Sequence, residues 1–195
     1  MVDDERERIL AAAWGVLRRT GYENLKMQGV ATASGVSVGS LYRRFGSKEA
    51  LLAEVYRQEI QRVVRVLWEK TRHGSPVQRV RTWIELMAGT GLGEGRRQAK
   101  AHWFGHLPEE VSRLATSGDD VDVSAPLRAA VTDGIRDGSF PSADVDWDVP
   151  FVLALCGRLA MGTPWWSAQD PGVATERLVR FVLGALGRPV GSEAP

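Results

Sequence analysis

Residues 35–48 read GVSVGSLYRRFGSK, and this stretch predicts the turn, the second helix and the exit of a helix-turn-helix. Gly35 offers a turn position that is open to positive φ, and Ser37 is placed to cap the following helix by accepting a backbone N–H. Three apolar residues are spaced to pack inward, namely Val36, Leu41 and Phe45. A helix of about seven residues is too short to be stable alone, so the flanking sequence must supply a scaffold.

The other side of this short helix is polar and cationic. It carries Ser40, Arg43 and Arg44, with Tyr42 at its edge. Ser47 is placed to cap the next helix, and Lys48 lies in the first turn of that helix, where free backbone N–H groups attract anions such as phosphate. This face therefore suits a polyanion.

The charge of the chain is divided between its two halves. Residues 1–100 hold 18 Lys or Arg against 11 Asp or Glu, a net charge of +7, whereas residues 101–195 hold 7 against 13, a net charge of −6. Between Arg18 and Lys48, six basic residues stand against one acidic residue, Glu23. Ordinary solvated helix faces also carry charges, but this concentration of positive charge around the helix-turn-helix favours a nucleic acid as partner.

The composition is typical of a protein of the cytoplasm. Hydrophobic residues make up 44% of the chain, and the single cysteine, Cys156, excludes an internal disulfide framework. The first residues are acidic rather than a basic and apolar secretory signal. The longest apolar run is about twelve residues, whereas a bilayer span needs about twenty. We therefore expect a cytoplasmic protein with no membrane partner.

Apolar residues recur at helical spacing along most of the chain, and no convincing strand alternation is seen, so the sequence predicts an all-α fold. Beyond the short helix within 35–48, the expected helices cover residues 4–19, 27–33, 48–72, 76–92, 96–107, 109–116, 126–137, 146–161 and 173–186. Residues 1–47 then form a three-helix DNA-binding domain whose third helix enters the major groove. Residues 48–195 form a larger helical domain, and no linker separates the two.

The last predicted helix is apolar over much of its girth. Val179 and Leu183 widen its main stripe, and a helix of this kind needs two partners. One partner can be the core of the domain, and the other can be a second subunit. We assign a dimer interface to five residues of this helix: Leu178, Val179, Val182, Leu183 and Leu186.

Residues 21–52, GYENLKMQGVATASGVSVGSLYRRFGSKEALL, resemble the DNA-binding signature of the tetracycline-repressor (TetR) family of bacterial transcription regulators. The glycine, turn, Tyr-x-x-Phe and Lys positions all occur at the spacing of that family. Carried over by position, Ser40 and Arg43 look like base-edge or groove contacts, and Tyr42 and Lys48 look like phosphate contacts. The resulting set of DNA-binding residues is Ser37, Ser40, Tyr42, Arg43, Arg44 and Lys48.

The resemblance also carries expectations beyond the helix-turn-helix. It implies a homodimer built from the last two helices of each subunit, a palindromic operator, and a ligand cavity in residues 48–195 that controls repression. Leu25 stands where the family usually has a Thr that caps the second helix, so either Asn24 caps that helix or the helix starts without such a cap. Val38 and Arg44 also depart from the usual residues, and both bear on the operator sequence.

Aromatic residues are frequent in the larger domain, which favours an apolar cavity with a few polar anchors. Core packing is the alternative for each of them. Our hypothesis is that the cavity is lined by Trp83, Met87, His102, Trp103, His106, Phe151 and Leu155. The two histidines lie four residues apart and could share a metal ion, but no third ligand is evident, so no metal site is predicted.

The sequence thus indicates a homodimeric repressor that an apolar or aromatic small molecule releases from a palindromic operator, with no cofactor. A transcriptional activator, or a small-molecule-binding protein with the same fold, stays open. Residues 35–39, GVSVG, also fit the G-x-S-x-G pattern of hydrolases. That pattern needs a preceding strand, whereas a helix, VATAS, is expected here, so no enzyme is predicted.

Overall fold

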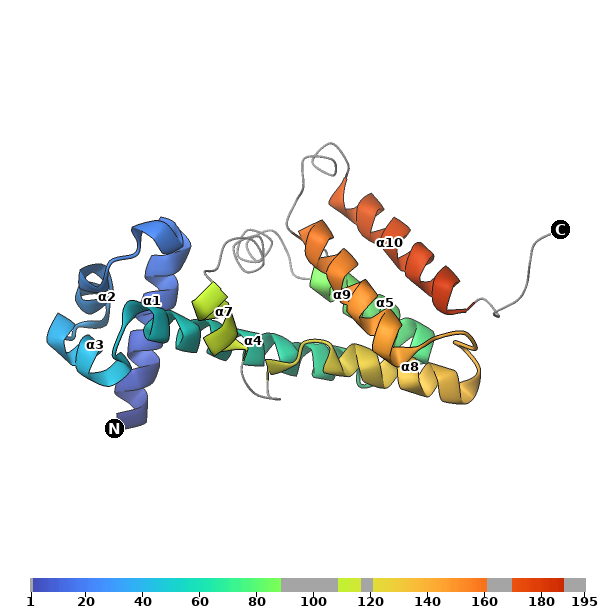
Figure 1. The fold of residues 1–195 in the computed structure, drawn as a ribbon, viewed down its shortest axis with the longest axis horizontal. Helices are drawn as coiled ribbons and strands as arrows, with labels where there is room; N and C mark the ends of the chain where they lie inside the picture. The colour runs from blue at the N-terminus through green and yellow to red at the C-terminus, as the bar shows by residue number, and fades with distance from the viewer. Residues whose placement is uncertain (1, 89–108, 117–120, 161–169, 188–195) are drawn as a thin grey trace. The chain divides into compact units, whose positions relative to one another are not determined.

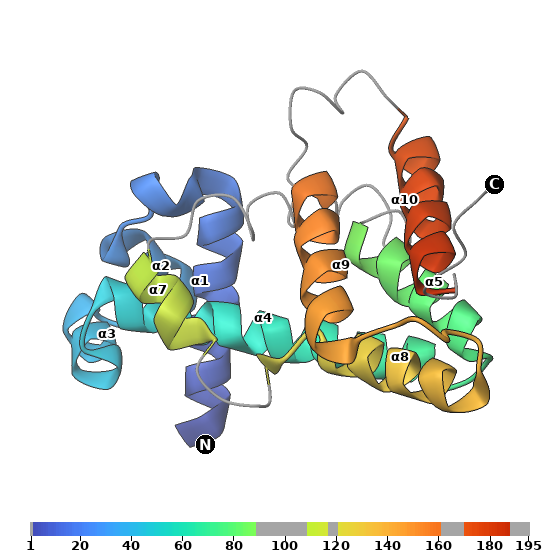
Figure 2. The same ribbon diagram turned by 45° about the vertical axis from the view of Figure 1, so that its right-hand side comes forward.

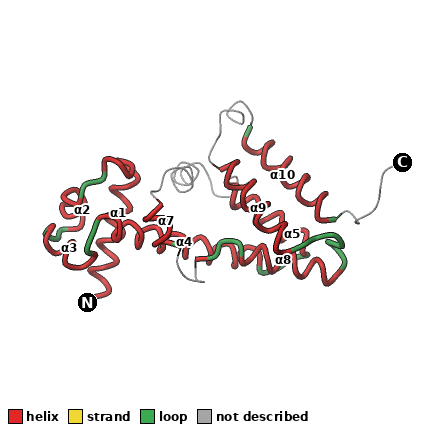
Figure 3. The backbone as a smooth tube through the Cα atoms, viewed as in Figure 1, coloured by secondary structure: helices red, strands yellow, loops and turns green. Residues whose placement is uncertain are grey.

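The structure, a computed structural model, describes residues 2–88, 109–116, 121–160 and 170–187 (Figure 1). Every regular element within these ranges is a helix (Figure 3), which confirms the predicted all-α fold. The helices are α1 (Val2–Asn24), α2 (Met27–Ser34), α3 (Val38–Phe45), α4 (Lys48–Thr71), α5 (Pro76–Ala88), α7 (Glu109–Ala115), α8 (Ala125–Asp137), α9 (Val145–Ala160) and α10 (Pro171–Leu186). None of the described helices has the length and apolar character that a bilayer crossing requires.

The chain folds into two compact units. The N-terminal unit comprises residues 1–62 and 106–121, and the C-terminal unit comprises residues 63–105 and 122–195. The division falls within α4, so the first part of this helix belongs to the same unit as α1, α2 and α3. The boundary expected at residue 47 divides the chain by expected function, DNA binding before it and ligand binding after it, rather than by packing. It stays a prediction.

The N-terminal unit is held together by apolar side chains from its four main helices. Figure 2 shows α2 beside α1 and α3 beside α2. The largest fully buried side chains of this unit are those of Ile9, Leu10, Leu25, Leu41, Leu51 and Leu52. Because each fully buried side chain of this size contributes roughly 1.5–3 kcal/mol, tertiary packing rather than intrinsic propensity stabilises the eight-residue helices α2 and α3.

The connection between α1 and α2 decides which of two sequence-based expectations holds. Gly21 has non-helical angles (φ 73°, ψ 170°), so the regular course of α1 is broken there, close to the end that was expected at residue 19. The N-cap of α2 is Lys26, which makes no side-chain capping bond. Asn24 does not cap α2, because its amide donates instead to the carbonyl of Thr20. Leu25 is 2% exposed and contributes packing in place of a cap.

The C-terminal unit is built around α5. In this unit α5 packs against α8, α9 and α10, and α9 also lies beside α10 (Figures 1 and 2). Trp83 of α5 is fully buried in the resulting core, and its indole N–H donates to the carbonyl of Val123 at 3.0 Å. The buried indole thus has a hydrogen-bond partner, as a buried polar group requires.

A glycine allows a close approach of an aromatic ring to α8. Phe140 is 1% exposed, and its ring lies so near Gly134 that an added Cβ there would stand 2.0 Å from the ring atom Cδ2. The backbone N–H of Phe140 also donates to the carbonyl of Gly134 at 2.9 Å. Position 134 therefore has no room for a side chain.

Candidate nucleic-acid interface

Two glycines and two serines shape the chain just before and just after α3. Gly35 (φ 72°) precedes the helix and Gly46 (φ 80°) follows it, both in conformations that favour glycine. The hydroxyl oxygen of Ser37 accepts the backbone N–H of Ser40 at 3.1 Å, which confirms the predicted cap. Ser47 accepts the backbone N–H of Ala50 at 3.0 Å and caps α4 in the same way. The helix α2, rather than a strand, precedes Ser37, so the G-x-S-x-G pattern lacks the strand that a hydrolase needs.

The two sides of α3 differ sharply in exposure. Leu41 and Phe45 are buried in the N-terminal unit, whereas Tyr42 is 48% exposed and Arg43 is also exposed. Ser40 is half-buried between the two sides. The structure therefore presents Arg43 and Tyr42 together on the open side of a short helix that is anchored from the other side.

The adjacent arginines of α3 have different surroundings. Among the described residues, Arg43 makes no ion pair or side-chain hydrogen bond. Arg44 is half-buried, and its guanidinium lies 3.3 Å from a carboxylate oxygen of Glu5 in α1. Sequence spacing alone placed Arg43 and Arg44 on one outer face of α3. The ion pair with Glu5 shows that, of the two, only Arg44 has a charged partner among the described residues.

Lys48, the predicted phosphate contact, has partners within the N-terminal unit. Its ammonium donates to the carbonyl of Tyr22 at 3.0 Å and lies 4.6 Å from the centroid of the Tyr22 ring. Burial, followed by the negative charges of Glu49 and Glu23, raises the pKa of Tyr22, so its phenol stays protonated at neutral pH. Lys48 thus links the start of α4 to the end of α1.

We expect Lys48→Met to lower the free energy of unfolding by about 1–2 kcal/mol, because it removes a charge-assisted hydrogen bond and a cation–π contact. Chemical denaturation of the full chain measures the change. The control is Arg43→Met, which also replaces a cationic side chain by methionine, but at an exposed position of α3. This control should leave the stability unchanged. Equal stability of Lys48→Met and the unaltered protein would contradict this role.

The residues predicted to line a ligand cavity are not brought together by the described structure. Trp83 and Met87 are buried in the core of the C-terminal unit, whereas Phe151 and Leu155 are 58% and 41% exposed. The buried residues of α9 are Val149, Val152 and Cys156, and Phe151 and Leu155 lie outside this buried stripe. His102, Trp103 and His106 lie outside the described residues.

The predicted dimer residues also divide into two groups. Val179, Val182 and Leu186 are buried in the core of their own unit, and Leu178 and Leu183 pack against that core while half-buried. The core therefore accounts for the side of α10 that the sequence assigned to a partner. The exposed large apolar residues of α9 and α10 are different ones: Trp147, Phe151, Leu155, Val173 and Phe181.

We call the exposed sides of these two neighbouring helices, which carry the five side chains, the apolar face of α9 and α10. On α9, Trp147, Phe151 and Leu155 follow each other at intervals of four residues, and the Trp147 and Phe151 ring centroids are 6.1 Å apart. On α10, Val173 and Phe181 lie two helical turns apart and are 50% and 66% exposed. From the sequence, Phe151 and Leu155 were assigned to a cavity and the other three residues to no site, although all five are large and apolar.

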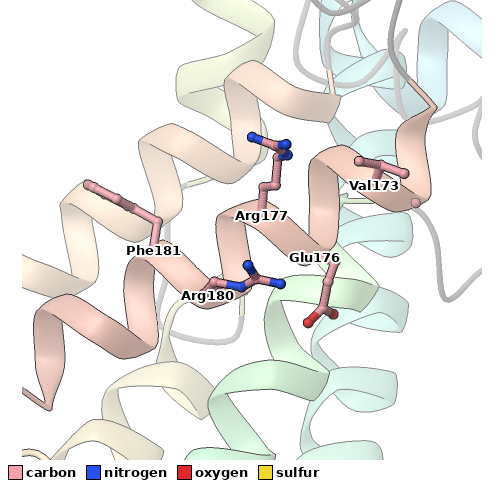
Figure 4. Close-up of a pocket in the computed structure, with 6 residues that line it drawn as sticks. Val173, Glu176, Arg177, Arg180 and Phe181 are labelled. Carbon is pink, nitrogen blue, oxygen red and sulfur yellow. The ribbon is translucent and has the colours of Figure 1, made fainter.

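A shallow depression lies on the outer side of α10. Figure 4 shows that its labelled side chains project from this one helix, and the full lining is Gly172, Val173, Glu176, Arg177, Arg180 and Phe181. Glu176 is paired with Arg81 of α5 at 2.7 Å, and this bond lowers the pKa of the Glu176 carboxyl. Since one helix supplies the whole lining, the depression is part of an open surface rather than an enclosed ligand cavity.

Comparisons with known proteins agree with this arrangement. The family model described as bacterial regulatory proteins, tetR family, matches residues 9–55. The HTH-type transcriptional repressor KstR of Mycolicibacterium smegmatis is 36% identical over 196 residues, which span 95% of this chain and 90% of that protein. The corresponding repressor of Rhodococcus jostii is 40% identical over 60 residues, which span 31% of this chain and 28% of that protein.

Solved structures share the fold over nearly the whole chain. A regulator from Saccharomonospora viridis in complex with choline has a TM-score of 0.76 at 21% identity, covering 96% of this chain and 100% of that one. FadR of Bacillus subtilis in complex with stearoyl-CoA has a TM-score of 0.71 at 16% identity, covering 92% of this chain and 98% of that one. At these identities the likeness shows a common fold.

Proposed function

The chain belongs to the TetR family of bacterial regulatory proteins, and from this membership we propose that it is a homodimeric repressor of transcription. Regulators of this family are DNA-binding proteins rather than enzymes, and three relatives that match in sequence, all named KstR, are transcriptional repressors. The dimer would bind a palindromic operator through one α3 from each subunit and leave it when an apolar small molecule binds. The observation that carries the proposal is α3 itself, a capped helix with buried anchors and an exposed arginine.

Arg43 is the residue of α3 that we propose to read the operator sequence. It is exposed and has no ion-pair partner among the described residues, so its guanidinium is available to a base edge. Arg can bind guanine O6 and N7 with two parallel hydrogen bonds. Tyr42 and Ser40 would contact the backbone or groove beside it, and Ser37 would act through its cap of α3.

We expect Arg43→Ala to lower the preference for the operator over unrelated DNA by roughly tenfold, because one bidentate contact is lost. The operator is first obtained by selection from random duplexes with the unaltered protein, and the preference is then measured by competition binding at fixed salt. The control is Arg65→Ala, which removes an exposed arginine of α4.

Two results would count against the proposal. If the unaltered protein enriches no sequence from the random pool, operator binding itself fails. If Arg43→Ala and Arg65→Ala change the preference equally, DNA binding stands but the assigned role of Arg43 does not. The two outcomes separate the function from the residue that we propose to carry it.

The homodimer is supported by the apolar face of α9 and α10. Isolated exposed apolar residues are ordinary, but three aromatic rings and two aliphatic side chains on neighbouring helices mark an interaction surface. A second copy of the same pair would cover it and form a four-helix bundle with two-fold symmetry. Two α3 helices of such a dimer would enter successive major grooves about 34–36 Å apart.

Release by a ligand requires that the ligand bind one dimer geometry better than the other. We propose α4 as the element that carries the change, because this continuous helix contributes to both units. Within the N-terminal unit, Arg57 of α4 donates to the carbonyl of Leu114 in α7 at 2.9 Å. A shift of α7 would therefore act on the helix that directly follows α3.

For the effector we propose a small molecule that is apolar or carries a long apolar chain, and a long-chain acyl-CoA, whose acyl chain is apolar and whose CoA part is charged, is the first compound to try. FadR of Bacillus subtilis, which shares the fold, was solved with stearoyl-CoA. The test is release of the selected operator in a mobility-shift assay, together with quenching of tryptophan fluorescence. Release by stearoyl-CoA or by a wholly apolar compound supports the proposal, whereas an operator complex that withstands both kinds of compound at saturating concentration contradicts it.

A further inference from the structure

The first turns of α1 carry alternating charges that reach other helices of the N-terminal unit. Glu5 lies 3.3 Å from the guanidinium of Arg44 in α3. Arg6, the next residue, lies 2.7 Å from a carboxylate oxygen of Glu54 in α4. Since neighbouring residues on a helix point about 100° apart, α1 can contact α3 and α4 at the same level.

A third contact ties α1 to α2. The guanidinium Nε of Arg8 donates to the carbonyl of Ser34 at 3.4 Å. Ser34 is the last residue of α2 and directly precedes the Gly35 turn, so the cation lies at the negative end of the helix dipole. Ser34 itself is buried, and its hydroxyl donates to the carbonyl of Val30 at 2.7 Å. Arg8 thus holds the end of α2 at the point where the turn towards α3 begins.

We call Glu5, Arg6 and Arg8 the α1 clamp. Its members contact α3, α4 and α2 in that order, so one short segment touches all three other main helices of the N-terminal unit. Arg6 and Glu54 form an ion pair without an aligned hydrogen bond. The positive charge of Arg6 thus compensates the buried carboxylate oxygen of Glu54.

The contact with α3 bears on DNA recognition because it is made by a residue next to Arg43. Leu41 and Phe45 anchor the inner side of α3, and a contact on a flank of so short a helix adds to what fixes its rotation about the helix axis. The Glu5–Arg44 pair supplies a contact on a flank of the helix, and its side chains are 35% and 25% exposed. A small rotation of so short a helix would displace the guanidinium of Arg43 from a base edge.

We infer that Arg44 is a positioning residue: paired with Glu5, it fixes the orientation in which α3 presents Arg43 to DNA, and it does not itself read the operator. The inference rests on the proposed function, since it assigns a role within operator binding. It also changes the sequence-based assignment of Arg44 as a DNA contact. A direct DNA contact and a positioning role make opposite predictions for the carboxylate of Glu5.

The test measures the preference for the selected operator over a scrambled duplex of equal length, at a temperature where every variant is folded by circular dichroism. We expect Glu5→Gln and Arg44→Gln each to lower this preference about two- to fivefold, the range set by a partly exposed ion pair. The double variant E5Q/R44Q should lose no more than either single one, because both remove the same contact. Exchanging the charges in Glu5→Arg/Arg44→Glu should restore the preference to within about twofold.

The matched control is Glu7→Gln, which removes an exposed carboxylate from the same turns of α1. It reports the general gain in DNA affinity when a negative charge is lost. If Arg44 contacts DNA directly, Glu5→Gln should behave like this control or bind the operator more tightly. The charge exchange should then weaken operator binding strongly, because it places the carboxylate of residue 44 against DNA. Either of these results overturns the inference while leaving operator binding intact, whereas failure of the unaltered protein to select any sequence overturns the proposed function.

Discussion

Phe181→Glu is expected to hold the protein as a monomer and to lower its affinity for a palindromic operator by more than about 100-fold, because the two half-sites are then bound separately. Phe181 is 66% exposed on α10, and the proposed four-helix bundle would bury its ring against a second copy. A carboxylate in that position would lose its hydration in the dimer, and this raises the free energy of the dimer.

Analytical ultracentrifugation measures the first part of this prediction, and competition binding on the selected operator measures the second. Val77→Glu is the matched control, since Val77 is an exposed apolar residue of α5 outside the apolar face of α9 and α10. It should leave both the mass and the affinity unchanged. A Phe181→Glu protein that sediments as a dimer at micromolar concentration would refute the proposed interface.

Gly134→Ala is expected to destabilise the protein by about 3 kcal/mol, at the upper end of the cost of overpacking a core. Helix propensity alone predicts the opposite sign, because alanine is favoured over glycine inside a helix by about 1 kcal/mol. The close approach of the Phe140 ring reverses that sign: the new Cβ would stand 2.0 Å from Cδ2 and 2.6 Å from Cε2. Phe140 is buried and cannot move aside without disturbing the core of the C-terminal unit.

Thermal and chemical denaturation test this prediction against a second glycine of the same unit. Gly157 lies in α9, and a Cβ added there would meet no atom within 4 Å. Gly157→Ala should therefore leave stability unchanged or raise it by up to about 1 kcal/mol. If the two alanine variants had the same stability, the close packing at position 134 would be refuted.

The frame of α3 could be predicted from the sequence because it depends on interactions within a few residues. The positive φ of Gly35, the cap by Ser37 and the burial of Leu41 all follow from local spacing, and the structure has them where they were expected. The all-α fold followed for the same reason, since helical periodicity is a local signal.

Contacts between distant parts of the chain could not be predicted in this way. The apolar stripe of α10 is so wide that spacing alone did not show which part of it packs against the core of its own unit. Val182 was assigned to a dimer interface, although it is buried in that core. Nothing near Arg44 in sequence indicates its partner Glu5. Spacing alone also did not show that Trp83 is fully buried in the core whereas Phe151, assigned to the same cavity, is 58% exposed.

The separation of α3 into anchors and exposed contacts has an evolutionary consequence. Leu41 and Phe45 hold the helix, while Arg43, the residue that we propose to read the operator, is exposed. Surface substitutions usually change stability by no more than about 0.5 kcal/mol. After gene duplication, a copy of this protein could therefore acquire a new target sequence through a change at position 43 while its fold stays intact.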